Sequence, residues 1–263
     1  MKKNQIKELV KQTYTKVLQE RSSCCSPNCC DIDTATDFSG EYEKIEGYVP
    51  AADYKLGCGI PTDHARLFEG ATVLDLGSGA GNDVFVARHF VGESGYVIGV
   101  DMTEAMIAQA NKNKAALGYS NVEFRLGEIE ALPVDDNSID IVLSNCVMNL
   151  VPDKEKAYQE AFRVLKPGGH FSISDIVIRG ELPKEIQEAA ALYAGCVAGA
   201  MAKDAYLSVI RKAGFTAIEV PIEQVIELPD SLLKRHLPAD KLADFRASGV
   251  QVVSITVYAA KPA

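Results

Sequence analysis

The sequence predicts an α/β fold, in which helices cover a mostly parallel, seven-stranded sheet with an antiparallel strand at the C-terminal end. From Ala71 onward, short apolar runs alternate with segments of helical length, as in parallel sheets with helical crossovers. The first apolar run leads into a glycine-rich turn at 77–81, which is typical of a strand followed by a helix. Two further strand-like runs, 215–220 and 252–260, end the chain and complete the predicted sheet.

The first 69 residues are expected to form a lid segment over a main domain that covers 70–263. Apolar residues at helical spacing predict an amphipathic helix over 6–18. A turn-rich stretch, 22–30, follows it and holds four cysteines. Residues 31–47 are polar and acidic without clear periodicity, so we expect a loop or short helices packed over the main domain.

Turn-forming residues separate the apolar runs of the main domain. Leu117-Gly118 is typical of a helix end, and Pro167-Gly168-Gly169 of a turn before a strand. The connection 221–249 is longer than a hairpin turn and is expected to carry a short helix. Two segments, 180–210 and 221–249, are expected to cover a substrate. The predicted strands are 71–76, 96–101, 122–127, 139–145, 170–177, 215–220 and 252–260, and the predicted helices are 82–90, 103–117, 154–164 and 183–213.

Charge and hydropathy exclude several classes of protein. The formal net charge is −9 and no basic run occurs, which argues against a nucleic-acid partner. No apolar run approaches the roughly 18 residues that a membrane span requires. The N-terminus lacks the apolar core of a signal peptide. We therefore expect a cytoplasmic protein, and a monomer, that binds neither nucleic acid nor membranes.

Candidate ligand-binding residues follow three successive predicted strands. The glycine-rich turn follows the first and lets the backbone approach a ligand without obstruction by Cβ atoms. Asp101 ends the second, where a carboxylate can accept hydrogen bonds from both ribose hydroxyls, and Glu128 follows the third, beside a possible adenine site. Each acid taken singly fits a helix cap or a solvated loop equally well. In an open α/β sheet, the loops after these three strands line one crevice. Taken together, the glycine-rich turn and the two acids therefore predict a nucleotide-type cofactor.

This combination resembles the class I S-adenosylmethionine-dependent methyltransferases, which have a Rossmann-like sheet. The similar segments are Leu74-Asp75-Leu76-Gly77-Ser78-Gly79-Ala80-Gly81, Gly99-Val100-Asp101-Met102 and Leu165-Lys166-Pro167-Gly168-Gly169. The resemblance implies that S-adenosylmethionine is the cofactor and that the turn contacts its methionine part. The cofactor-binding residues implied in this way are Asp75, Gly77, Ser78, Gly79, Gly81, Asp101, Met102, Glu128, Ile129 and Asn145.

The cysteines indicate the methyl acceptor. The sequence has seven, an odd number that argues against a full disulfide framework in a reducing compartment. Cys58 lies between two glycines, Cys146 follows the fourth predicted strand, and Cys196 lies in a small-residue stretch after the fifth. Three thiolates suit a soft, three-coordinate centre such as trivalent arsenic, which keeps a lone pair for attack on a methyl group. The alternative for each cysteine is a small buried side chain.

Leu56-Gly57-Cys58-Gly59 and Ser144-Asn145-Cys146-Val147 resemble segments of the arsenite methyltransferases. The resemblance implies that Cys58, Cys146 and Cys196 bind As(III), supplied as arsenite or as a thiol conjugate. It also implies that an external thiol reductant, glutathione or thioredoxin, supports turnover. A cysteine pair near the N-terminus of the family matches the region of Cys24-Cys25. We expect Cys24, Cys25, Cys29 and Cys30 to deliver arsenic or to take part in redox chemistry, with a tail of no function as the alternative.

Two other functions compete with arsenic methylation. A methyltransferase of the same fold can act on carbon in an organic small molecule such as a quinone or a sterol. That function requires an acid or histidine base at the crevice and has no use for three cysteines. A metalloid-binding protein without enzymatic activity would keep the thiols but would not need an intact cofactor site.

Overall fold

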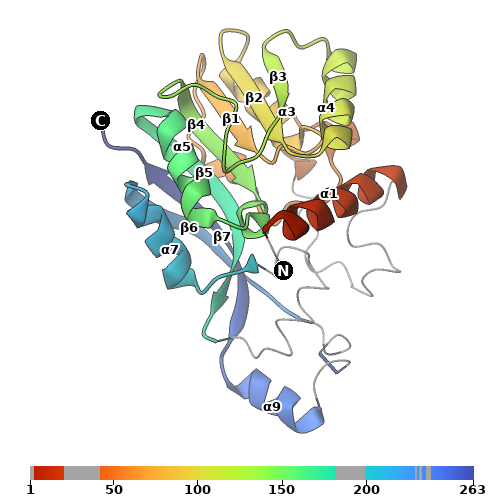
Figure 1. Cartoon of the computed structure of the whole chain (residues 1–263), viewed down its shortest axis with the longest axis vertical. Helices are drawn as coiled ribbons and strands as arrows, with labels where there is room; N and C mark the ends of the chain where they lie inside the picture. The colour runs from red at the N-terminus through yellow and green to blue at the C-terminus, as the bar shows by residue number, and fades with distance from the viewer. Residues whose placement is uncertain (1–2, 21–41, 182–198, 229, 231–232, 235–237) are drawn as a thin grey trace.

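The computed structural model describes residues 3–20, 42–181, 199–228, 230, 233–234 and 238–263 (Figure 1). It contains a seven-stranded sheet in the order β3-β2-β1-β4-β5-β7-β6. β7 is antiparallel to both of its neighbours, whereas β1 to β5 pair in parallel. The strands are β1 (Thr72–Leu76), β2 (Tyr96–Asp101), β3 (Val122–Leu126), β4 (Ile139–Asn145), β5 (Leu165–Arg179), β6 (Thr216–Ile226) and β7 (Gln251–Ala260).

Helices cover both faces of the sheet (Figure 1). α3 and α4 pack on one face through residues such as Phe85 and Ala110. α5 and α7 pack on the other through residues such as Tyr158 and Tyr206. The described helices are α1 (Lys3–Glu20), α3 (Asn82–Val91), α4 (Glu104–Leu117), α5 (Lys154–Val164), α7 (Lys203–Lys212) and α9 (Ala239–Ala247), with short 3-10 turns η1 (Pro50–Ala52), η2 (Pro61–His64) and η3 (Met148–Leu150).

The predicted fold class is confirmed, and most predicted strands lie within a residue or two of the observed ones. Two strands are longer than predicted. β5 runs over 165–179 rather than 170–177, and β6 continues to Ile226 rather than ending at residue 220. Pro221 suggested an end of the strand because proline cannot donate a ladder hydrogen bond. β6 is the outermost strand of the sheet, however, where proline is tolerated.

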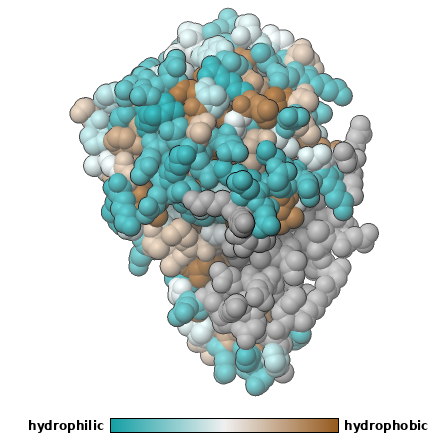
Figure 2. All heavy atoms as spheres, viewed as in Figure 1, coloured by the Kyte–Doolittle hydropathy of each residue, from teal (hydrophilic) through white to brown (hydrophobic). Residues whose placement is uncertain are grey.

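The connection after β6 therefore starts six residues later than expected, and it carries the expected short helix as α9. Of the predicted helix 183–213, the structure confirms the C-terminal part as α7. The prediction is wrong at 200–202, which are not helical, because Ala202 forms a parallel bridge with Ile178 of β5. Residues 182–198 lie outside the described residues, as do most of 31–47. In the described part of the chain, none of the helices has the length and apolar character needed to cross a membrane. Figure 2 shows mainly hydrophilic residues over the described part of one face, with apolar residues in small scattered groups.

Candidate active site

The glycine-rich turn between β1 and α3 forms the floor of a pocket. Gly77 and Gly79 have φ values of +70° and +51°, in the left-handed region that favours glycine. A Cβ atom at Gly77 would lie 2.6 Å from both methyl carbons of Val147, so the backbone leaves no room for a side chain there. The amide of Gly77 donates to the carbonyl of Val100 at 2.8 Å, which fixes the turn to the end of β2.

Asp101, at the end of β2, accepts hydrogen bonds from two backbone amides. Its Oδ2 accepts from the Gly79 amide at 3.0 Å, and its Oδ1 accepts from the Thr103 amide at 2.8 Å. Burial raises the pKa of Asp101, and these two donors oppose the rise because they favour the carboxylate. The side chain thus holds the turn and the start of α4 in place around the pocket.

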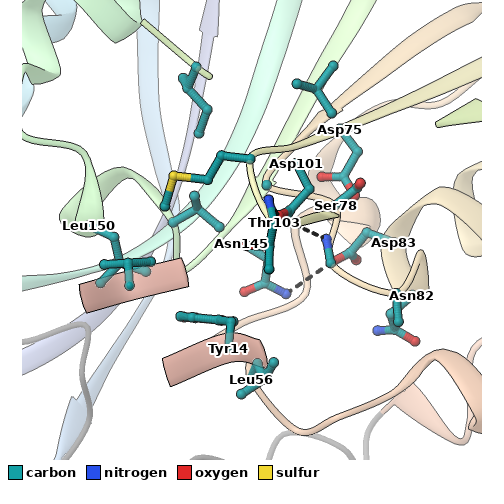
Figure 3. A pocket seen from close by; sticks show the side chains of 18 of the residues that line it. Tyr14, Leu56, Asp75, Ser78, Asn82, Asp83, Asp101, Thr103, Asn145 and Leu150 are labelled. Atoms are coloured by element: carbon teal, nitrogen blue, oxygen red, sulfur yellow. Dashed lines mark hydrogen bonds between the residues drawn. The ribbon is translucent and has the colours of Figure 1, made fainter. Parts of the chain in front are cut away.

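Two further acids, Asp75 and Asp83, lie on the same side of the pocket as Asp101 (Figure 3). Burial raises the pKa of Asp75 well above its ordinary value, and the charges of Asp83 and Asp101 raise it further. Burial also raises the pKa of Asp83, to about 6, although hydrogen bonds from Tyr42 and Asn145 favour its charged form. Closely spaced buried carboxyls of this kind favour a cationic ligand, which relieves their mutual repulsion.

α1 and the segment after β3 form two further walls. Lys7, Val10 and Tyr14 of α1 line the pocket together with Glu128 and Ile129. The Nζ atom of Lys7 lies 2.8 Å from Glu128 Oε2 and 2.7 Å from Glu130 Oε2. Ion pairs to Glu128 and Glu130 therefore fasten α1 across the pocket.

The pocket residues fit S-adenosylmethionine. The Ser78 hydroxyl and Asn82 Oδ1 are buried and have no hydrogen-bond partner among the residues that the structure describes. Buried polar atoms are normally satisfied, so these two indicate a polar ligand. The three acids of the pocket match a ligand with positive charge. Glycine at position 77 also keeps the turn free of a side chain, because a Cβ atom there would collide with Val147.

Cys58 and Cys146 lie side by side next to this pocket. Cys58 comes from the loop before η2 and Cys146 directly follows β4, and both are buried. Their Sγ atoms and a carboxylate oxygen of Asp175 all lie within 4.8 Å of one another. Cys146 has a φ of +60°, which is uncommon for a residue with a side chain and is typical of functional sites.

Asp175, in β5, belongs to a buried polar network. Its carboxylate accepts hydrogen bonds from the Ile176 amide at 3.0 Å and from the Tyr206 hydroxyl at 3.2 Å. Tyr158 donates in turn to the Tyr206 hydroxyl at 2.7 Å. Burial raises the pKa of Asp175 to about 7, against the effect of these donors and of the Lys154 charge. A carboxyl group that titrates near neutrality therefore adjoins the two thiols.

Comparison with known proteins identifies the family. A family model described as a methyltransferase domain matches residues 67–214. An arsenite methyltransferase of Halobacterium salinarum is 40% identical over 98% of this chain and 67% of its own length. The chain belongs to the arsenite methyltransferase family. Human arsenite methyltransferase is 36% identical over 85% of this chain and 62% of its own length. The crystal structure of an arsenic(III) S-adenosylmethionine methyltransferase from Chlamydomonas reinhardtii is 35% identical, with a TM-score of 0.68, covering 88% of this chain and 71% of that one.

In this member of the arsenite methyltransferase family, nine of the ten predicted cofactor residues line a single pocket: Asp75, Gly77, Ser78, Gly79, Asp101, Met102, Glu128, Ile129 and Asn145. The tenth, Gly81, does not line it. Gly81 precedes α3 with a φ of +100°, and a Cβ there would lie 2.8 Å from the rings of Phe85 and Phe124. Its position allows the turn to pack against the core.

The structure brings together two of the three predicted arsenic ligands, Cys58 and Cys146. Cys196 lies outside the described residues, as do Cys24, Cys25, Cys29 and Cys30.

Sequence reasoning missed two residues of this site, Asp83 and Asp175. Asp83 could have been found, because it stands two residues beyond the last glycine of the turn, in the first turn of α3. Asp175 stands near the end of a predicted strand, where acids often serve a site. The hydroxyl contacts of Tyr42 with Asp83 and with the Gly59 carbonyl are made only in the folded chain, so the sequence does not predict them.

Proposed function

We propose that the protein transfers the methyl group of S-adenosylmethionine to trivalent arsenic held by Cys58, Cys146 and Cys196, and that it serves in arsenic detoxification. The observation that carries this proposal is the buried pair of thiols, Cys58 and Cys146, beside a pocket that suits a cationic derivative of adenosine. Similarity to arsenite methyltransferases over most of the chain supports the same conclusion.

The cofactor supplies a methyl group on a positively charged sulfur. Asp75 and Asp83 would counter the positive charges at the turn, and Asp101 would accept hydrogen bonds from the ribose. Glu128 and Ile129 would hold the adenine. We propose that the lid segment, residues 1–69, excludes water from the reaction, since α1 already crosses the pocket.

The thiols provide the chemistry on the acceptor side. When a thiol replaces a hydroxyl of arsenite, its proton leaves with that hydroxyl as water, and an As–S bond replaces the As–O bond. Soft thiolates favour trivalent arsenic over hard cations. The arsenic lone pair attacks the methyl carbon, so the step needs no general base and depends mainly on alignment. Methylation oxidises arsenic to the pentavalent state, and an external thiol such as glutathione or thioredoxin would return it to the trivalent state.

The role of Cys196 is supported by the residue three positions after it. A Cβ atom at Gly199 would lie 1.8 Å from the carbonyl oxygen of Asn149, so this part of the chain packs tightly against η3. η3 begins two residues after Cys146 in the chain. The described chain therefore resumes at Gly199 beside the segment that follows Cys146, which supports Cys196 as the third proposed ligand.

Mass spectrometry of the products formed from purified protein, S-adenosylmethionine, arsenite and glutathione tests the function. Methylated arsenicals are expected with the natural sequence. Cys58→Ser, Cys146→Ser and Cys196→Ser should each weaken As(III) binding and lower methyl transfer at least about 100-fold, because serine is a hard, neutral ligand. Calorimetry with S-adenosylhomocysteine should show cofactor binding within about twofold of the natural protein. Normal methylation of arsenite by Cys58→Ser and Cys196→Ser would exclude the thiol site.

Asp175 favours one second candidate, methylation of carbon in an organic small molecule. Such a reaction needs a base, and this buried carboxyl with a pKa of about 7 lies beside the same crevice. A panel of quinones and sterols with radiolabelled cofactor tests it. Label transfer to an organic acceptor that is lost in Asp175→Asn but kept in Cys58→Ser would favour this second function.

A further inference from the structure

The backbone around Cys58 is held from two sides. The Cys58 amide donates to Asn145 Oδ1 at 3.0 Å. The Cys58 carbonyl accepts from the Ser254 hydroxyl of β7 at 2.5 Å. The thiol is therefore fixed through its own peptide groups, by one side chain from β4 and one from β7.

The flanking glycines press this loop against the sheet. A Cβ at Gly57 would lie 2.7 Å from Asn145 Nδ2, and a Cβ at Gly59 would lie 2.7 Å from the Ser174 hydroxyl. Because neither position has space for a side chain, the loop lies directly on Asn145 and Ser174. The position of Cys58 thus depends on where the Asn145 side chain is held.

Asn145 is itself held by residues of the cofactor pocket. Its Nδ2 donates to Tyr42 Oη at 2.7 Å, to the Gly59 carbonyl at 2.8 Å and to Asp83 Oδ2 at 3.3 Å. The Tyr42 hydroxyl donates to Asp83 Oδ1 at 2.7 Å. Figure 3 shows Asn145 beside Asp83, with a hydrogen bond between them. Tyr42, Asp83 and Asn145 line the pocket, whereas Cys58 does not.

We propose that Asn145 is a positioning residue of the acceptor site: its side chain fixes the Cys58 loop to the pocket wall, so that a ligand in the pocket restrains the loop and protects Cys58. Its Oδ1 accepts from the loop, and its Nδ2 donates both to the loop, at the Gly59 carbonyl, and to the pocket residues Tyr42 and Asp83. This gives Asn145 a role beyond the cofactor contact predicted from the sequence. The inference rests on the proposed function only for the identity of the pocket ligand.

The experiment measures how fast iodoacetamide alkylates Cys58, with peptide mass spectrometry to separate it from the other cysteines. No arsenic is present, so the result does not depend on the acceptor. Asn145→Ala should raise the rate roughly tenfold, as expected for loss of buried hydrogen bonds. Ser144→Ala is the matched control, because it removes a buried hydrogen bond to the Leu76 carbonyl from the neighbouring residue and leaves the Cys58 loop intact.

Coupling to the pocket is measured by adding S-adenosylhomocysteine. At saturating ligand, alkylation of Cys58 should slow severalfold in the natural protein and in Ser144→Ala. Tyr42→Phe, which keeps the ring and removes only the hydroxyl, is tested at a ligand concentration that saturates it, set from its own measured affinity, and should lose most of this protection. Circular dichroism shows whether Asn145→Ala folds. If it does not fold, the protection of Cys58 in Tyr42→Phe still tests the coupling between the pocket and the Cys58 loop.

The proposal is overturned if Asn145→Ala folds and alkylates at the rate of Ser144→Ala. It is also overturned if Tyr42→Phe keeps the full protection. Weaker ligand binding by Asn145→Ala with an unchanged rate at Cys58 would leave Asn145 as a cofactor contact only. Failure to methylate arsenite, by contrast, would overturn the proposed function without touching this result.

Discussion

The cofactor pocket and the thiol pair lie side by side, but they are built in different ways. The part of the pocket predicted from the sequence is formed by short segments at the ends of β1, β2 and β3. The thiol site joins the loop before η2, the residue after β4 and the middle of β5. One region depends on local backbone conformation, and the other on the alignment of distant segments. Substitutions should therefore act differently on the two.

The largest effect is expected from a change in the local region, Gly77→Ala. It combines a φ of +70° with a Cβ 2.6 Å from Val147, so we expect a loss of about 4 kcal/mol in stability and loss of cofactor binding. Gly168→Ala is the control, since Gly168 has a φ of +78° but nothing within 4 Å of its Cβ position. It should cost only about 1 kcal/mol. Urea denaturation and calorimetry measure both; equal losses would show that the contact with Val147 is unimportant.

The next largest effect concerns the thiol region and its buried acid. The pKa of Asp175 is about 7 when folded and near 3.8 when unfolded. Between pH 5 and pH 7 the unfolded chain therefore binds fewer protons at this group, and the stability that it contributes falls as pH rises. We expect Asp175 to account for a loss of about 2 kcal/mol over this range. Urea denaturation of arsenic-free Asp175→Asn at both pH values should show a correspondingly smaller loss; an unchanged pH dependence would contradict the raised pKa.

A smaller effect is expected at the junction of the two regions, at Asp83. Its pKa of about 6 means that it gains negative charge as pH rises from 5 to 7. The affinity for positively charged S-adenosylmethionine should rise up to about tenfold over this range. S-adenosylhomocysteine, whose sulfur is neutral, is the control ligand and should respond less. In Asp83→Asn, the affinities for the two ligands should depend on pH to the same extent. If S-adenosylmethionine still responds more strongly to pH in this variant, the response comes from another acid.

The smallest effect is expected at the lid. Lys7→Met removes ion pairs at 2.8 Å and 2.7 Å that hold α1 to Glu128 and Glu130. Cofactor affinity should fall about two- to fivefold, and less at high salt, because partly exposed ion pairs contribute little. Lys11→Met is the control on the same helix, since its ion pair with Glu8, at 3.8 Å, lies within α1. Equal effects of the two substitutions would show that Lys7 does not fasten the lid.

The sequence by itself determined the order of strands and helices, the glycine turn and the acids Asp75, Asp101 and Glu128, since periodicity and turn chemistry are local properties. It also indicated the thiols through the segments around Cys58 and Cys146. Only the tertiary structure decided that Asp175 joins the thiols, that Tyr42 and Asp83 hold Asn145, and that β6 continues past Pro221 as an edge strand. These features depend on contacts between segments far apart in the chain. Folding fixes such contacts by burial and pairing, and local patterns carry little information about them.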